Sequence, residues 1–129
     1  MAYCPIRLAV DLDVEEIITV HYFEYRNDFS FEGESHDFWE FLCVDKGEVQ
    51  VRAGTETYLL KKGEMIFHKP NEFHSVMATG QSAPNLVVIS FSCRSEAMRF
   101  FENALLTIGE EGRNLLAGIL SEAKQAFLP

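Results

Sequence analysis

Basic residues, long apolar runs and cysteines are all scarce in this sequence. Eleven Lys and Arg residues stand against twenty Asp and Glu residues, which gives a formal net charge of −9. Such an acidic surface repels the phosphates of nucleic acids and of anionic membranes, so the chain by itself is expected to bind neither. The longest aliphatic run, residues 86–89, is far too short to span a bilayer.

The cysteines are few and scattered. Cys4, Cys43 and Cys93 are odd in number, and no two of them have the close spacing of a thiolate metal site or a redox dithiol. We therefore expect small, reduced, apolar side chains in a cytoplasmic protein. The first residues also lack the basic and then apolar pattern of a signal peptide.

Short strands are the dominant pattern up to about residue 93. The 129 residues are enough for one domain. Turn residues recur about every 8–12 positions, which is typical of an antiparallel sandwich or barrel. No helical stretch is long enough to connect parallel strands. Runs rich in β-branched, aromatic or alternating apolar residues predict strands at residues 17–25, 38–44, 49–52, 57–60, 65–68, 74–77 and 86–91.

From residue 95 the pattern becomes helical. Ser95 is a candidate N-cap, and apolar residues from Ala97 to Ile108 then recur at helical spacing. A second helix follows, and because amphipathic helices must bury their apolar stripe, we predict that it forms a homodimer interface. The residues of this predicted interface are Leu115, Leu116, Ile119, Leu120, Ala123 and Phe127. The opposite arrangement, in which this helix covers the barrel and the helix around Phe100 joins the subunits, stays open.

Histidines and glutamates provide the candidate site. His36 and Glu40 are an even number of residues apart, so both side chains can share one face of a strand. His74 begins a later predicted strand, and Glu34 precedes His36 by two residues. Two imidazoles and two carboxylates can hold a divalent metal such as Zn, Ni, Fe or Mn, or they can form a hydrogen-bonded group without a metal.

Residues 33–74 resemble a cupin, a small double-stranded β-helix barrel of the jelly-roll type. His36, Glu40 and Gly47 match the spacing of the first cupin segment, with Glu34 in the place of its first histidine.

The second cupin segment is matched by Gly63, Pro70 and His74, with Ala78 where an asparagine often follows. The resemblance is closer to one branch of the family, the N-terminal regulatory domain of AraC-type transcription regulators. Three stretches carry it, together with the two helices that follow the strands: residues 36–48, 62–66 and 70–74.

This resemblance implies a mainly β fold, a cupin barrel with two C-terminal α-helices. It implies a single regulatory domain over residues 1–129, with an N-terminal arm or first strand at 1–16, the barrel at 17–93 and dimerisation helices at 95–128. The domain would bind a small-molecule effector and relay this to a DNA-binding domain outside this chain. Enzymatic activity is not expected. The alternative is a stand-alone metal-dependent cupin enzyme or small-molecule-binding protein.

Aromatic residues near the first two predicted strands are candidates for the effector pocket. Stacking rings with a few polar groups suit a sugar or a planar metabolite. Alternation places Trp39 on the opposite face from Phe38 and Glu40. His21 and His68 are assigned no role. The candidate ligand-binding residues are Phe23, Tyr25, Phe38 and Trp39, with His36, Glu40 and His74 as polar anchors.

Overall fold

The structure is a computed structural model that describes residues 3–6 and 11–127, apart from the side chain of Phe127. Residues 1–2 and 7–10 of the expected arm or first strand, and residue 128 of the expected helical region, lie outside the described residues. The strands are β1 (Val14–Glu24), β2 (Ser30–Glu34), β3 (Trp39–Lys46), β4 (Glu48–Ala53), β5 (Glu56–Lys61), β6 (Glu64–His68), β7 (His74–Ala78), β8 (Asn85–Cys93) and β9 (Leu105–Thr107). The helices are η1 (Glu96–Phe101) and α1 (Glu110–Phe127).

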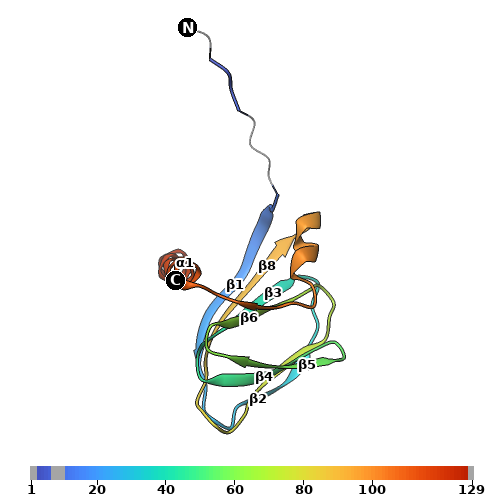
Figure 1. The fold of residues 1–129 in the computed structure, drawn as a ribbon, viewed down its shortest axis with the longest axis vertical. Helices are drawn as coiled ribbons and strands as arrows, with labels where there is room; N and C mark the ends of the chain where they lie inside the picture. The colour runs from blue at the N-terminus through green and yellow to red at the C-terminus, as the bar shows by residue number, and fades with distance from the viewer. Residues whose placement is uncertain (1–2, 7–10, 128–129) are drawn as a thin grey trace.

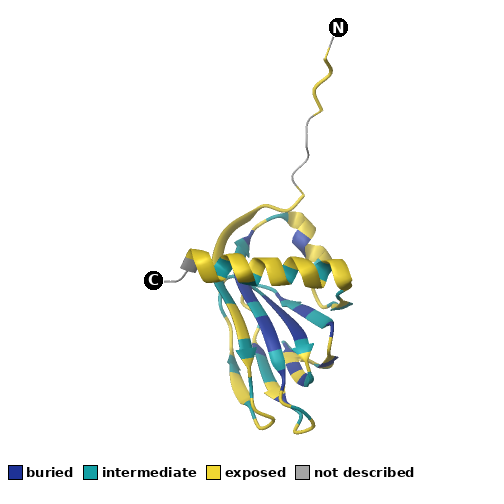
Figure 2. Ribbon diagram, turned by 90° about the vertical axis from the view of Figure 1, so that its left-hand side faces the viewer, coloured by how far each residue is buried: buried dark blue, intermediate teal, exposed yellow. Residues whose placement is uncertain are grey.

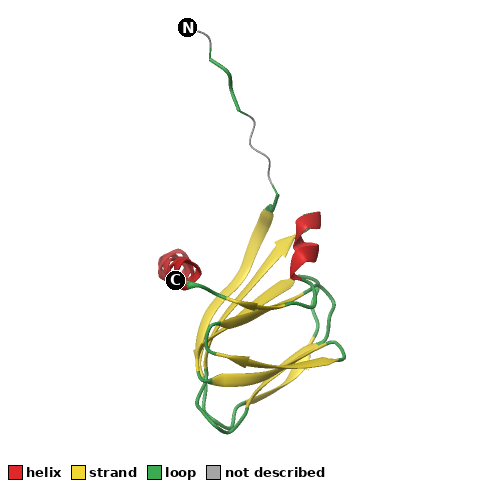
Figure 3. Cartoon of the chain, in the orientation of Figure 1, coloured by secondary structure: helices red, strands yellow, loops and turns green. Residues whose placement is uncertain are grey.

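Two antiparallel sheets face each other (Figure 1). Within the described residues, one sheet has five strands in the order β1-β8-β3-β6-β9, and the other has four in the order β2-β7-β4-β5. Neighbours in space are often distant in sequence, as in the pairing of β1 with β8 and of β2 with β7. The predicted mainly β, antiparallel barrel is confirmed. Both helices follow β8, and the short strand β9 lies between them in the chain (Figure 3).

Alternation along the strands divides the apolar side chains between the inside of the barrel and its outer face. Each fully buried Leu or Ile contributes about 1.5–3 kcal/mol to the free energy of unfolding, because its apolar surface is removed from water. The inner cluster consists of Leu42, Val44, Val49, Val51, Ala53, Leu60, Ile66 and Leu86. It fills one part of the barrel, and the polar site described below lies in another.

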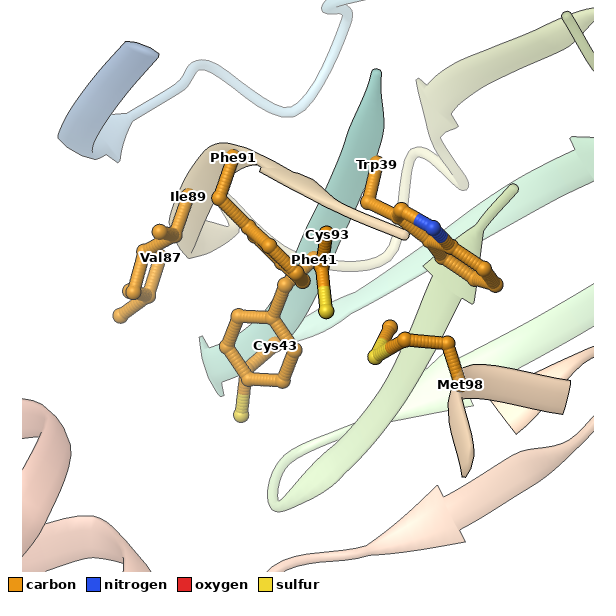
Figure 4. Close-up of a cluster of buried hydrophobic side chains, with 8 residues drawn as sticks. All are labelled: Trp39, Phe41, Cys43, Val87, Ile89, Phe91, Cys93 and Met98. Carbon is orange, nitrogen blue, oxygen red and sulfur yellow. The ribbon is translucent and has the colours of Figure 1, made fainter. Parts of the chain in front are cut away.

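A second cluster lies on the outer face of the five-stranded sheet (Figure 4). Trp39 packs here with Met98 of η1, and Leu116 and Leu120 of α1 lie against the same cluster. Figure 2 shows α1 crossing this face of the strands with an exposed outer side. The cluster consists of Trp39, Phe41, Cys43, Val87, Ile89, Phe91, Cys93 and Met98.

The first predicted α-helix is wrong in type and extent. It is a six-residue 3-10 helix, followed by a turn at Asn103 (φ 53°) and the short strand β9. Ser95 gives no side-chain cap to this helix, and its hydroxyl oxygen accepts a hydrogen bond from the backbone N–H of Asp13. Residues 105–107 pair with the edge of β6, so ladder hydrogen bonds replace the helix that the local spacing favours.

Strands β2 and β9 are absent from the sequence prediction, and β1 begins at Val14, within the region expected to be an N-terminal arm or first strand. Strand β2 carries one large apolar residue, Phe31, among polar residues and a glycine. Its pairing with β7 therefore decides its structure, and local propensity gives little signal for it.

Candidate functional site

Four polar side chains predicted from the sequence converge inside the barrel. His74 Nε2 lies 3.2 Å from Glu40 Oε2, and His36 Nε2 lies 3.4 Å from Glu40 Oε1. Glu34 Oε1 is 3.8 Å from His36 Nε2. One ligand atom from each of the four residues lies within 4.8 Å of all the others. The fold thus brings residues 34–40 and His74, which are far apart in the sequence, into contact.

The positions of Glu40 and His74 follow from the strands that carry them. Glu40 points into the barrel because its neighbours Trp39 and Phe41 belong to the outer cluster. His74 is the first residue of β7 and is buried. These two residues come from different sheets, so the site lies where the sheets face each other.

A bulge in β2 brings Glu34 to the same place. The register with β7 shifts between Phe31 and Glu34, so both of these residues line the cavity although they are three apart. Gly33 lies within the shift with a φ of 121°. A Cβ there would meet the Phe73 ring and lie 2.8 Å from the His74 carbonyl oxygen, so only glycine fits.

Backbone carbonyls fix the hydrogen positions of both histidine rings. His36 Nδ1 lies 3.0 Å from the Phe38 carbonyl oxygen, and His74 Nδ1 lies 3.1 Å from the Glu72 carbonyl oxygen. A carbonyl oxygen only accepts, so each Nδ1 carries the hydrogen and each neutral ring presents a bare Nε2. Within the described chain, neither Nε2 has a hydrogen-bond partner, because a bare Nε2 and the nearby Glu40 carboxylate oxygens are all acceptors.

The pKa shifts reflect this crowding of opposite charges. Burial works against the ionised form of Glu40, but the facing histidines, His74 above all, outweigh it and lower the pKa of the carboxyl. Burial likewise works against the charged form of His74, but Glu40, the Glu72 carbonyl and Glu34 together raise the pKa of the ring. The site therefore favours an ionised Glu40 with positive charge beside it.

His68 also belongs to this region, although the sequence analysis assigned it no role. It lies opposite Glu40 in the pairing of β3 with β6, and its ring stacks on His74 with centroids 4.3 Å apart. Its side chain is 1% exposed, and this burial lowers the pKa of His68 to about 4. The even spacing from Ile66, a core residue, was the available signal that His68 faces inward.

A cavity of about 380 Å³ opens beside the polar groups. Of the candidate aromatic residues, Phe23, Tyr25 and Phe38 line it, whereas Trp39 lies in the outer cluster. Neither Trp39 nor His74 is among the residues that line the cavity. The whole lining is Thr19, His21, Phe23, Tyr25, Phe29, Phe31, Glu34, His36, Phe38, Glu40, Leu42, Val76, Leu86, Val88 and Ser90. Three of its rings, those of His21, Phe29 and Phe31, were not among the candidate ligand-binding residues.

The rings of this wall form a continuous column. The centroid of Phe23 lies 5.0 Å from that of His21 and 5.1 Å from that of Tyr25, and Tyr25 stacks on Phe29 at 3.6 Å. Phe38 stacks on His36 at 3.9 Å. The cavity thus combines aromatic faces with a polar end, as small-molecule sites do.

The comparison with protein families decides the assignment. The model of the AraC-like ligand binding domain matches residues 17–110. The chain belongs to this family. The resemblance to AraC-type regulators is thereby confirmed, and this AraC-like ligand binding domain carries its cavity and polar site within the matched residues. No curated protein sequence matches the chain.

Solved structures share the cupin fold of this AraC-like domain. Vibrio cholerae ToxT matches with a TM-score of 0.57 and 13% identity over 80% of this chain and 46% of that one. The Schizosaccharomyces pombe Cnp3 cupin domain matches with a TM-score of 0.54 and 15% identity over 57% and 51%. A predicted oxalate decarboxylase from Thermotoga maritima matches with a TM-score of 0.56 and 17% identity over 59% and 67%. The chain thus spans about half of ToxT and of the Cnp3 domain.

Helix α1 of this AraC-like domain divides the predicted interface between two faces. Leu116 and Leu120 pack against the outer cluster of the barrel, and Ala123 is half-buried. Leu115 is 69% exposed and Ile119 44% exposed, so both point away from the barrel. The side chain of Phe127 lies outside the described residues.

In the part of the chain that the structure describes, neither helix is long and apolar enough to cross a membrane.

Proposed function

We propose that this chain is the effector-sensing domain of an AraC-type transcription regulator. In this proposal a small molecule binds in the barrel cavity, and its binding is relayed to a DNA-binding domain elsewhere in the full-length protein. The observation that carries the proposal is the cavity of about 380 Å³, with its aromatic wall and polar end, inside a domain of the AraC-like ligand binding family. Enzymatic activity forms no part of it.

The effector is a molecule with a flat face, a sugar or a planar metabolite. A flat face can stack on the ring column of Phe23 and Tyr25. Polar groups of the ligand would then meet Glu40 and His36 at the other end of the cavity. Binding can be relayed only if the ligand binds one arrangement of barrel and helix more tightly than the other, because only then does it shift the equilibrium between the two.

The polar site also fits a divalent metal, which supports the alternative of a metal-dependent cupin enzyme or binding protein. The bare Nε2 atoms of His36 and His74 and the oxygens of Glu34 and Glu40 form a two-histidine, two-carboxylate set suited to Zn, Ni, Fe or Mn. A bound metal would supply positive charge and coordination positions for a ligand. Metal analysis of protein purified without chelators, before and after His74→Gln, decides between a metal site and a metal-free one.

Dimerisation is proposed through helix α1. Because Leu116 and Leu120 lie against the barrel, the exposed pair Leu115 and Ile119 would provide the apolar contact with a second copy. Phe100, which is 71% exposed, is the alternative contact.

The experiment is a thermal-shift screen of a metabolite library, because a ligand that binds only the folded state raises the melting temperature. Each hit is then tested on Val88→Phe, which adds a ring inside the cavity, and on Leu59→Phe, which adds the same ring on an exposed strand. Hits should stabilise the wild type and Leu59→Phe and leave Val88→Phe unshifted. Equal shifts in all three proteins would place binding outside the barrel. Operator binding by the full-length protein with and without a hit tests the relay.

A further inference from the structure

The polar end of the cavity presents hydrogen-bond acceptors from the lining residues Glu34, His36 and Glu40, and from His74, which contacts Glu40 but does not itself line the cavity. Because their Nδ1 hydrogens are already donated to backbone carbonyls, His36 and His74 in their neutral forms present only lone pairs at Nε2. Glu34 and Glu40 present carboxylate oxygens to the same space. The His74 side chain is 5% exposed, and its Nε2 has no hydrogen-bond partner in the described chain. Such a buried set of acceptors requires a donor, either a proton on an imidazole Nε2 or a bound cation in its place, because unpaired buried polar groups are costly.

Two kinds of ligand group match such a set: a metal cation, and an organic cation that carries several N–H donors and no acceptor. A primary ammonium has three donors and a full positive charge. Its hydrogen bonds to carboxylates are charge-assisted and stronger than those between neutral groups. A hydroxyl both donates and accepts, and an anion only accepts, so neither matches the site as well.

The rest of the cavity favours an organic cation over a neutral or anionic molecule. Among the described residues that line it, there is no Lys or Arg to hold an anion, and the acidic groups are Glu34 and Glu40. Glu34 is 52% exposed, so its carboxylate is accessible to an incoming ligand. The aromatic column of His21, Phe23, Tyr25 and Phe29 offers ring faces that attract positive charge and pack against a flat apolar body.

We propose that the effector of this barrel is a primary amine, protonated and attached to a flat apolar body. The ammonium lies between Glu34, Glu40 and the Nε2 atoms of the two histidines, and the body lies along the aromatic column. This inference rests on the proposed function, since it names the chemical class of the molecule that the cavity binds. It also implies that a divalent metal and the amine compete, because both require the same acceptors.

The test compares three probes of nearly equal shape: phenethylammonium, 2-phenylethanol and 3-phenylpropanoate. Binding to chelator-treated protein is measured by isothermal titration calorimetry at pH 7.5, where an amine with an ordinary pKa is protonated. Phenethylammonium should bind about tenfold or more tightly than the alcohol, because of its charge-assisted hydrogen bonds, and the propanoate should bind most weakly. Saturating Zn²⁺ should weaken phenethylammonium binding.

A pair of matched variants locates the effect. Glu34→Gln removes one carboxylate of the polar end and should abolish most of the preference for the ammonium over the alcohol. Glu32→Gln removes the same charge on the same strand from a residue outside the cavity lining, and the preference should persist. A preference that both variants retain or both lose would overturn the inference.

The remaining outcomes separate this inference from the proposed function. If the alcohol or the propanoate binds as tightly as the ammonium and Val88→Phe blocks it, the cavity binds ligands but the amine assignment is wrong. If none of the probes binds, the inference is also overturned, and the metabolite screen decides the proposed function separately. Ammonium binding that saturating Zn²⁺ leaves unchanged would show that the two cations do not share the acceptors, which contradicts the proposal.

Discussion

Nε2 of His74 in β7 lies 3.2 Å from Oε2 of Glu40 in β3, although the two strands belong to different sheets. Among the residues that the structure describes, no backbone ladder joins β3 to β7, so this contact between side chains links the two sheets at the polar end of the cavity. A cation bound there would be held by both sheets at once.

Zinc should stabilise the protein through the four acceptors. At Zn²⁺ concentrations about 100 times the Kd, the free energy of unfolding should rise by about 2.7 kcal/mol, since the metal binds the folded state. Urea denaturation with Zn²⁺ or with a chelator measures this. His74→Gln should lose most of the increment, whereas His21→Gln, which changes a histidine of the same cavity outside the four, should retain it. Equal losses in the two variants would contradict a site at these residues.

Gly33 should tolerate no side chain. In Gly33→Ala the new Cβ meets the Phe73 ring and the His74 carbonyl at a positive φ, so we expect a loss of about 1–3 kcal/mol in the free energy of unfolding. Gly80→Ala is the control, because its φ of 87° is also positive but no atom lies within 4 Å of the added Cβ. Urea denaturation should find Gly33→Ala the less stable variant. Equal stabilities would mean that the backbone conformation, and not the close packing of β2 on β7, selects glycine.

His68 should make the stability of the fold sensitive to acid. Burial lowers the pKa of His68 from 6.5 to about 4, with the charges of His74 and His36 acting in the same direction. Between these two values the unfolded chain binds a proton at this position that the folded chain does not, so the free energy of unfolding decreases as the pH falls from about 6.5 to about 4. Above 6.5 this contribution is fully present.

The variant His68→Gln removes this titration. Urea denaturation of chelator-treated protein at a series of pH values gives the difference in unfolding free energy between wild type and variant. As the pH falls from 6.5 to about 4, the free energy of unfolding of the wild type should decrease relative to that of the variant. A difference that does not change with pH would contradict the burial of an uncharged His68.

Adjacent residues of α1 should respond differently to the same substitution. Leu120→Asp places a charge against the outer cluster and should lower the free energy of unfolding by about 1–3 kcal/mol. Ile119→Asp alters an exposed residue, so stability should change by no more than about 0.5 kcal/mol while self-association is lost. Sedimentation velocity and urea denaturation measure both effects. A dimer that persists in Ile119→Asp and Leu115→Asp would point to the Phe100 surface instead.

Local patterns in the sequence were enough for much of the fold. Alternating apolar residues and turn glycines such as Gly47, which has a φ of 75°, marked the strands from β3 to β8, because both signals act between neighbours in the chain. The same alternation indicated that Trp39 faces away from Glu40, and the structure places Trp39 in the outer cluster. The spacing of His36 and Glu40 and the position of His74 pointed to one shared site.

Pairing between distant segments decided what the sequence could not. Residues 105–107 have helical spacing, yet they form β9 because the edge of β6 offers backbone hydrogen bonds to them. The inward position of Glu34 needs the bulge at Gly33, and that bulge exists only where β2 pairs with β7.

The sequence by itself determined which residues can be strands, which faces are apolar and which side chains can bind a cation. Only the tertiary structure decided that His68 stacks on His74, that Leu116 and Leu120 cover the barrel, and that two histidine Nε2 atoms share one space with two carboxylates. The reason is physical: alternation and turn propensity are properties of a few consecutive residues. Strand register and helix packing, in contrast, depend on the free energy of contacts between residues far apart in the chain.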